Sequence, residues 1–448
     1  MKKQFFLLLA CANVSAQSPK ILRDRIDQYM RAQVTTHQFS GTVLVTQKGK
    51  VIYDNAFGLA NREWKVPNTP DTKFPVCSLA KQFTAAAILQ LQEQGKLKTS
   101  DVLAKYFPDY PKGDQVTLRM LLNHTSGIRE CSLDARWFAT DPNLPIAQLK
   151  DTILKTFKLK PYDFEPGTFW KYSNSGYLLL GFVIEQVSGE KYADYIRKNL
   201  LEKAGMTQSG SLVHDAIVPQ LADGYSLLTG KWTKGETRSV EIGFSAGNLY
   251  STTHDLDRWR DALMSGKIIG PVSLQEMDTP NHEDRGAGYG IFVDRFFGKR
   301  ALHHGGAMSG VNTFMIDYPD DGLRIIILTN RDTNLDFVHK GLAGIVFGYD
   351  VLPTHVRKRQ PVDSSLLANY TGTFQTDNIP FPINLVQNND KLYWRIHRDI
   401  ELVPESNQSF YIDEPDVEFQ VEFELTNDKQ IKTAYVIEGG VKMIMKKT

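Results

Sequence analysis

A serine followed three residues later by a lysine, at the head of a long helix-forming run, most constrains this chain. Ser78 and Lys81 precede an alanine-rich apolar segment with no Gly or Pro before Gly95. Ala, Leu and Gln favour helix, so the sequence predicts a helix that begins at Ser78. Residues three apart on a helix share a face, which puts the Lys81 amine near the Ser78 hydroxyl. The unpaired N–H groups of a helix start also stabilise an anion.

This arrangement favours a nucleophilic serine, because a hydroxyl needs a neighbour that accepts its proton. The alternative is structural: Ser78 caps the helix and Lys81 is solvated. These four residues alone do not separate the two interpretations, but two further motifs follow them in the chain.

The second motif is Tyr172-Ser173-Asn174, directly before an apolar run typical of a helix. A tyrosine whose pKa is lowered by cationic neighbours can shuttle a proton between a serine and a leaving group. The Asn174 amide offers a donor and an acceptor to a substrate amide. The alternative is a turn with a buried tyrosine hydroxyl.

The third motif is His304-Gly305-Gly306, ahead of the strand-like run at 313–316. Its glycines let a backbone edge approach a substrate closely. His303 is expected to face the opposite side of the strand. The alternative is an ordinary hairpin glycine pair beside a surface histidine.

In this order, Ser-x-x-Lys, Tyr-Ser-Asn and His-x-Gly resemble the serine β-lactamase and penicillin-binding-protein superfamily, in its class C-like branch. Segment 74–85 is similar to that family's nucleophile segment, and 121–128 to the loop between its first two motifs. The likeness covers roughly residues 25–350. It implies an acyl-serine site whose residues have separate roles. The implied catalytic residues are Ser78, Lys81 and Tyr172, the substrate-binding residues are Asn174, His304 and Gly306, and the oxyanion hole consists of the backbone N–H groups of Ser78 and Ala307.

One position departs from the class C pattern. Class C β-lactamases usually carry lysine where this chain has His304, whereas several DD-peptidases, D-amino-acid peptidases and related hydrolases carry histidine. A histidine can change its charge across physiological pH, and a cation at His304 would attract a substrate carboxylate. The resemblance therefore points away from a dedicated antibiotic-destroying enzyme.

The predicted fold is α+β, with an antiparallel sheet flanked by helices and a mainly helical lobe, as the resemblance implies. Runs 41–45 and 50–53 predict one hairpin, and runs 313–316 and 323–328 another, both in that sheet. We assign residues 22–352 to the hydrolase domain, 353–362 to a solvated basic linker and 363–448 to a small all-β, barrel-like domain. The aromatic residues of that last domain are expected to fill its core, with ligand binding as the alternative.

Residues 1–16 have the charged and apolar regions of a secretory signal, with cleavage before Gln17. A lipoprotein anchored through Cys11 is the alternative. No later run is apolar enough to span a bilayer. Cys77 and Cys131 are expected to be unpaired thiols, although export permits a disulfide between them.

The sequence thus predicts a periplasmic or secreted serine hydrolase that forms an acyl-enzyme on amide or ester bonds. A D-alanyl peptide is the leading substrate, and a class C-like β-lactamase, an esterase and a D-aminopeptidase are alternatives. The non-enzymatic alternative is a penicillin-recognising sensor or scaffold. We expect a small-molecule or peptide partner, peptidoglycan stem peptides among them, with no metal or cofactor. The net charge of +1 gives no reason to expect nucleic acid.

Overall fold

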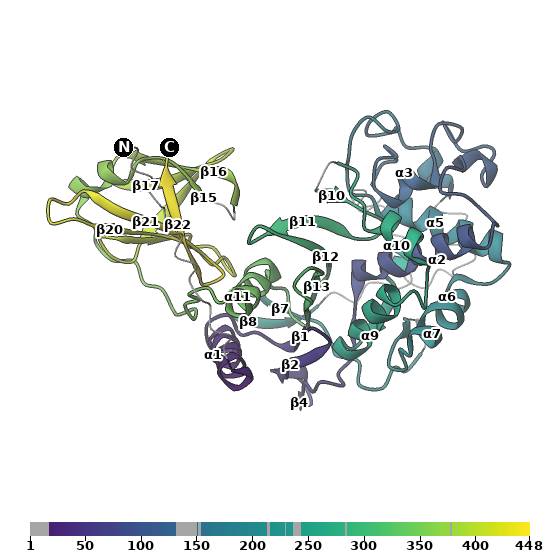
Figure 1. Cartoon of the computed structure of the whole chain (residues 1–448), viewed down its shortest axis with the longest axis horizontal. Coiled ribbons are helices and arrows are strands. Elements are labelled where there is room, and N and C mark those ends of the chain that lie inside the picture. The colour runs from purple at the N-terminus through teal and green to yellow at the C-terminus, as the bar shows by residue number, and fades with distance from the viewer. Residues whose placement is uncertain are drawn as a thin grey trace, which may run out of the picture.

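A computed structural model describes residues 18–130, 150, 154–212, 216–228, 230–235, 243–282, 285–376 and 379–448. These residues form an antiparallel sheet, a helical lobe and a closed C-terminal barrel (Figure 1). The predicted α+β class with an all-β C-terminal domain is confirmed. The expected signal segment, Cys11 and Cys131 lie outside the described residues. Among the described helices, each is too short or too polar to span a lipid bilayer.

The central sheet has the strand order β10-β11-β12-β13-β14-β1-β2. Its first and last sequence segments meet where β1 pairs with both β2 and β14. Both predicted hairpins are therefore present and share one sheet. The strands are β1 (Gly41–Gln47), β2 (Lys50–Phe57), β10 (Gly286–Ala287), β11 (Phe292–Phe296), β12 (Lys299–Met308), β13 (Val311–Tyr318) and β14 (Leu323–Thr329).

Alternation along these strands divides the core into two layers. Val43 and Val45 pack with residues of α1 (Pro19–His37) and α11 (Leu335–Phe347) on one face of the sheet. Leu44, which lies between them, packs with the helical lobe on the other face. Successive side chains of a strand point to opposite faces, so both faces of β1 must be apolar when both are covered.

The helical lobe is built around α2, which is buried over residues 81–91. Phe83 of this helix stacks on Trp259 with ring centroids 4.0 Å apart. The helices of the lobe are α2 (Lys81–Glu93), α3 (Leu118–Leu122), α5 (Asn174–Ser188), α6 (Tyr192–Ile196), α7 (Glu202–Ala204), α8 (Phe244–Gly247), α9 (Thr253–Met264) and α10 (Pro271–Met277), with the short helical turns η1 (Cys77–Ala80), η2 (Leu103–Lys105) and η4 (Arg197–Leu201). Short strands complete the core domain: β3 (Leu59–Asn61), β4 (Val66–Pro67), β5 (Phe74–Pro75), β6 (Gly210–Ser211), β7 (Tyr225–Leu228), β8 (Lys231–Lys234) and β9 (Leu249–Ser251).

The C-terminal barrel closes through the pairing of β15 with β22. Its aromatic residues pack on one another, with Tyr370 4.3 Å from Phe423 and Trp394 4.4 Å from Phe419 between ring centroids. These rings fill the barrel core, as expected. After the turn η6 (Ser364–Tyr370), its strands are β15 (Gly372–Thr376), β16 (Ile379–Asn388), β17 (Lys391–Arg395), β18 (Asp399–Pro404), β19 (Ser409–Tyr411), β20 (Phe419–Leu425), β21 (Ile431–Glu438) and β22 (Val441–Lys447).

The segment that leads into the barrel is mostly exposed, but Arg357 is half-buried, with its guanidinium 5.3 Å from the Tyr411 ring centroid. The barrel also contacts the core domain through buried polar groups. Gln33 of α1 donates to Glu418 at 2.9 Å, and Arg331 pairs with Asp416 at 2.8 Å. The basic linker is thus only partly solvated, and the barrel is anchored on the core domain.

Candidate active site

Ser78 lies in η1, the turn that immediately precedes α2. The regular helix begins at Lys81 rather than at Ser78, so the predicted helix start was wrong by one short turn. The N-cap position of η1 is occupied by Val76 and that of α2 by Ala80, and neither makes a side-chain capping bond. Ser78 occupies neither position and is half-buried. Ser78 is therefore not a helix cap, which removes the structural alternative for this residue.

The turn around Ser78 is held from both sides. The Val76 N–H donates to the Leu249 carbonyl at 2.8 Å, and the Thr313 hydroxyl donates to the Val76 carbonyl at 3.1 Å. Cys77 adopts a φ of 51°, in the left-handed region that non-glycine residues rarely occupy. Such backbone strain is maintained only where the surroundings enforce it, and it is concentrated at functional sites. Among the residues that the structure describes, the Cys77 thiol has no disulfide partner, and burial raises its pKa to about 12.

Lys81 connects the first two motifs. Its Nζ lies 3.1 Å from Ser78 Oγ and 2.7 Å from Asn174 Oδ1, and it donates to the Ala246 carbonyl at 2.7 Å. The Lys81 side chain is 0% exposed. A solvated lysine is therefore excluded, and the amine is placed where it can exchange a proton with Ser78.

Tyr172 lies beside Ser78 and Lys81. Burial raises its pKa above the ordinary tyrosine value, and a hydrogen bond with Ser78 only partly opposes that rise. Lys81 Nζ lies over the ring face, 5.0 Å from the ring centroid. The predicted lowering of the Tyr172 pKa by cations is wrong, because burial is the larger effect. The phenol is thus protonated at neutral pH and suited to donate.

Asn174 is fixed by a carboxylate that sequence reasoning missed. Its Nδ2 donates to Glu130 Oε1 at 2.9 Å, and its backbone N–H donates to the other oxygen of the same carboxylate. These bonds turn Oδ1 toward Lys81. An amide nitrogen carries two hydrogens, so one remains for a substrate carbonyl beyond the bond to Glu130. The one signal for Glu130 was its place two residues after the family-like segment 121–128.

His124, which lies inside that family-like segment, supports the second motif. Its Nδ1 accepts from the Ser173 N–H at 3.1 Å, and its ring centroid lies 4.5 Å from that of Tyr172. Burial and the Lys81 charge hold the His124 pKa well below its usual value. The neutral imidazole therefore positions the backbone that carries Tyr172 and Asn174.

The third motif brings β12 against the Ser78 turn. A Cβ at Gly306 would lie 2.6 Å from the Val76 carbonyl oxygen and 2.9 Å from Cys77 Cβ. Glycine is needed here because no larger residue fits without displacing backbone. Ala307 follows in the same strand. The two segments predicted to supply the oxyanion-hole N–H groups, at Ser78 and Ala307, thus lie side by side.

His304 lies within β12 and is 2% exposed, so it is not a surface histidine at a turn. Its ring centroid is 5.0 Å from that of Phe292 and 6.0 Å from that of Tyr172. Burial, reinforced by the Lys81 charge, lowers the His304 pKa to about 3. The predicted change of charge across physiological pH is therefore wrong, because a pKa this low keeps the imidazole neutral over that range.

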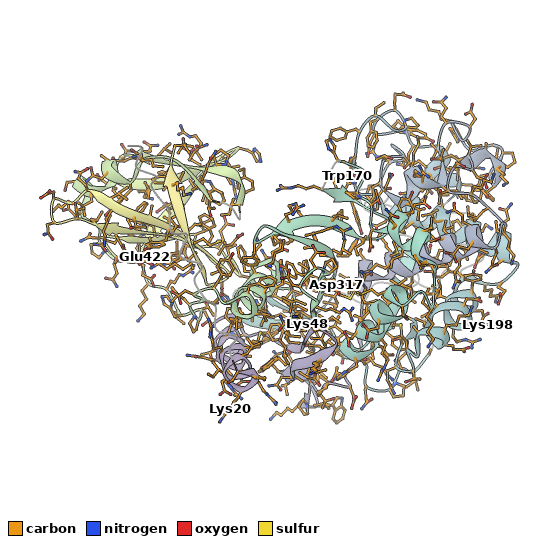
Figure 2. All side chains as sticks on the ribbon, viewed as in Figure 1. Lys20, Lys48, Trp170, Lys198, Asp317 and Glu422 are labelled. Atoms are coloured by element: carbon orange, nitrogen blue, oxygen red, sulfur yellow. The ribbon has the colours of Figure 1, made fainter. Side chains whose placement is uncertain are left out.

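His303 packs away from the site, as expected, with its ring centroid 5.6 Å from that of Phe314. On the site's outer rim, Trp170 contacts Phe292 with ring centroids 6.1 Å apart, and Trp170 is 38% exposed. Figure 2 shows Trp170 beside the sheet edge that faces the helical lobe. An aromatic wall thus borders the site on the β11 side.

The structure brings Ser78, Lys81, Tyr172 and Asn174 together, and comparisons with known proteins show which family has this fold. The family model described as Beta-lactamase matches residues 26–346. A penicillin-binding protein of Bacillus subtilis (strain 168) is 31% identical over 432 residues, which cover 90% of this chain and 94% of the relative. A D-aminopeptidase of Brucella anthropi is 26% identical over 315 residues, which cover 69% and 59% of the two chains.

Solved structures give the same fold. A penicillin-binding protein from Bacillus halodurans matches with a TM-score of 0.61 and 29% identity, covering 68% of this chain and 96% of that one. An octameric penicillin-binding protein homologue from Pyrococcus abyssi matches with a TM-score of 0.65 and 23% identity, covering 94% and 99%. The chain is therefore a serine hydrolase relative that belongs to the β-lactamase family.

Proposed function

We propose that this protein is a serine hydrolase that acylates Ser78 from an amide or ester of a D-amino-acid-containing substrate. One observation supports this most directly: Lys81 Nζ lies between Ser78 Oγ, at 3.1 Å, and Asn174 Oδ1, at 2.7 Å. The serine thus has a proton acceptor, and that acceptor is held by the residue expected to bind the substrate amide.

In the proposed reaction, the neutral Lys81 amine takes the Ser78 hydroxyl proton while Oγ attacks the substrate carbonyl carbon. The N–H groups of Ser78 and Ala307 stabilise the oxyanion of the tetrahedral intermediate. That intermediate collapses, the carbonyl–heteroatom bond breaks, and the Tyr172 phenol gives its proton to the leaving amine or alkoxide. The Lys81 proton then restores the phenol. Water repeats the sequence on the acyl-enzyme and releases the acid.

The neutral state of His304 narrows the substrate class. A free carboxylate at this wall of the site would meet a neutral ring rather than a cation. This disfavours carboxylate-terminated D-alanyl peptides, the leading substrate from the sequence, relative to D-amino-acid amides and esters. The similarity to a D-aminopeptidase supports that order. A sensor that is acylated but does not turn over is the second candidate, supported by the similarity to penicillin-binding proteins.

We also propose that the protein is exported, to the periplasm or beyond, because its first residues have the pattern of a secretory signal. D-amino-acid linkages occur in peptidoglycan stem peptides, which such a location would bring within reach. A fusion of residues 1–20 to a reporter that is active only outside the cytoplasm tests this part. A silent reporter would contradict export.

The function is tested by covalent labelling followed by substrate profiling. A fluorophosphonate and a labelled penicillin should each modify Ser78, as peptide mapping would show, and Ser78→Ala should not be labelled. Turnover is then compared on a D-alanine amide, a D-alanyl ester, a D-alanyl-D-alanine peptide and a cephalosporin. Fast turnover of the amide and ester supports the proposal. Labelling without turnover of any substrate would favour the sensor, and labelling of Ser78→Ala would refute the nucleophile.

A further inference from the structure

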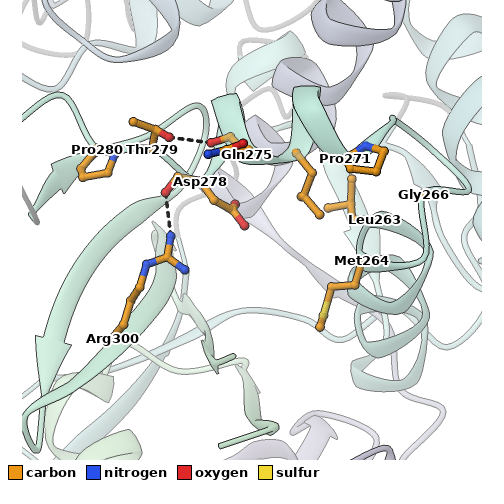
Figure 3. A pocket seen from close by; sticks show the side chains of 10 residues that line it. Leu263, Met264, Gly266, Pro271, Gln275, Asp278, Thr279, Pro280 and Arg300 are labelled. Carbon is orange, nitrogen blue, oxygen red and sulfur yellow. Dashed lines mark hydrogen bonds between the residues drawn. The ribbon is translucent and has the colours of Figure 1, made fainter. Parts of the chain in front are cut away.

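A cavity of about 420 Å³ lies outside the active site, between the end of α9, α10 and the start of β12 (Figure 3). One wall is apolar and is formed by Leu263, Met264, Pro271, Leu274 and Pro280. Met264 in this wall is 54% exposed. The volume of the cavity is in the range of small-ligand sites, and its apolar wall would cover an apolar group of a ligand.

The opposite side of the cavity is charged. The Asp278 carboxyl group points into the cavity, and its Oδ1 is buried without a hydrogen-bond partner among the described residues (Figure 3). Arg300 donates to the Asp278 backbone carbonyl at 2.9 Å, yet it forms no ion pair with any described carboxylate. The cavity therefore presents an acid and a guanidinium that do not satisfy each other.

Leaving a buried carboxylate oxygen without a donor is costly, and native structures rarely do so without a reason. Burial raises the pKa of Asp278, although the charges of Arg260 and Arg300 oppose that rise. Arg260, which does not line the cavity, pairs with Asp317 at 2.7 Å. The Asp278 carboxyl group thus lacks a hydrogen-bond donor, and a ligand in the cavity can supply one.

The cavity is separate from the Ser78 site. Arg300 and His304 both lie on β12, four residues apart, which corresponds to about 13 Å along a strand. The buried side chain of Leu302 lies between them on the same face. A molecule in the cavity would therefore not occupy the position of a substrate at Ser78.

We propose that this cavity binds a free α-amino acid with an apolar side chain. The ammonium group donates to the Asp278 carboxyl group, the carboxylate accepts from the Arg300 guanidinium, and the side chain packs on Leu263 and Leu274. A zwitterion supplies both missing partners at once, which neither a simple amine nor a simple acid does. The proposal stands apart from the proposed reaction, although hydrolysis of an amino-acid amide would release such a molecule.

The test is binding measured by NMR on the full chain with ¹³C-methyl methionine. Met264 lines the cavity, whereas Met308 lies at the end of β12 next to Ala307, so the two methyl signals report the two sites separately. Each signal is assigned from a Met→Leu variant. Both D- and L-leucine are titrated, together with isoamylamine and 4-methylpentanoate, which lack the carboxylate and the ammonium respectively.

We expect one leucine enantiomer or both to shift the Met264 signal and leave Met308 in place. Each truncated analogue should bind about tenfold or more weakly, since each loses a charge-assisted hydrogen bond. Asp278→Asn should weaken leucine binding to a similar degree, and Asp320→Asn, at an exposed turn, serves as the matched control. The analogue series keeps the test decisive if Asp278→Asn does not fold.

Three results would overturn the proposal: no shift of Met264 with either leucine, equal affinity for leucine and isoamylamine, or a shift confined to Met308. The last would mean that leucine binds at Ser78 only. None of these results depends on turnover, so failure of this proposal is distinct from failure of the proposed hydrolase activity.

Discussion

The charge of His304 makes the sharpest prediction about substrate choice. The pKa of His304 is lowered from 6.5 to about 3, so protonating this side chain in the folded protein costs on the order of 5 kcal/mol more than in water. At pH 5 only about one His304 side chain in a hundred is then an imidazolium. Between pH 5 and pH 9, His304 should therefore contribute no titration to kcat/KM for any substrate.

The assay compares pH profiles of kcat/KM for a D-alanyl peptide with a free carboxylate and for its methyl ester. Wild type and His304→Gln are measured in parallel. We expect the ratio of the two substrates to stay constant over this range in both proteins. His304→Lys is the positive control, because a fixed cation at this position should raise the rate for the carboxylate substrate relative to the ester.

A ratio that falls as pH rises through 6 to 7 in wild type, and is constant in His304→Gln, would refute this reasoning. Stability gives an independent check with a definite sign. A lowered histidine pKa means that the unfolded chain binds more protons, so the stability contribution is present above pH 6.5 and is lost as pH falls toward 3. His304→Gln should lose less stability than wild type over that interval in chemical denaturation.

Two further substitutions test the packing around the site, and a third tests the contact between the barrel and the core domain. Gly306→Ala places a Cβ 2.4 Å from Thr313 Oγ1, so it should lower the free energy of unfolding by about 1–3 kcal/mol and kcat by about a hundredfold. Gly305→Ala, whose Cβ would meet nothing closer than 3.5 Å, is the control in the same melting and rate measurements. In Glu130→Gln, the new NH2 group faces one of the two Asn174 N–H donors, and that hydrogen bond is lost. We expect kcat/KM to fall about tenfold or more while the melting temperature changes little. An unchanged rate would show that Glu130 does not position Asn174. Arg331→Ala leaves the half-buried Asp416 with His37, at 3.6 Å, as its remaining partner and should destabilise the chain by about 3 kcal/mol, whereas Arg359→Ala at the exposed pair with Glu401 should cost about 1 kcal/mol or less. Equal effects of these two arginine variants in thermal unfolding would mean that the barrel contact is not stabilising.

Local patterns in the sequence predicted the two hairpins, whereas the family resemblance predicted that they share one sheet and that the three motifs meet. The alternation around Leu44 and the turn at Lys48 and Gly49 are local signals, and each specified a strand or a hairpin. The start of α2 was misplaced because Ser78 belongs to a tight turn held by β9 and β13, which no neighbouring residue reveals. Spacing therefore predicted that Ser78 and Lys81 lie close together, but it did not predict the conformation of the turn that carries Ser78.

The electrostatics of the site were not predictable in the same way. His304 is neutral because Phe292, Tyr172 and Lys81 surround it, and these side chains come from β11, from the start of α5 and from α2. The Tyr172 pKa is raised for the same kind of reason, since burial is a property of the assembled site. The expected direction of the Tyr172 pKa was therefore wrong, and the ordinary pKa expected for His304 is lowered by burial.

The neutral imidazole also bears on how Ser78 is activated. As an ammonium, Lys81 donates to Ser78 Oγ, to Asn174 Oδ1 and to the Ala246 carbonyl. In the proposed reaction the amine has first lost one of its hydrogens, and its bonds to Asn174 and Ala246 keep it directed at the Ser78 hydroxyl. Taking the hydroxyl proton makes Lys81 a cation. The Lys81 charge repels a charge on His304, and such a coupling is reciprocal, so a cation at His304 would oppose proton transfer from Ser78. Burial of His304 removes that opposition, and the protonated phenol of Tyr172 remains as the donor to the leaving group.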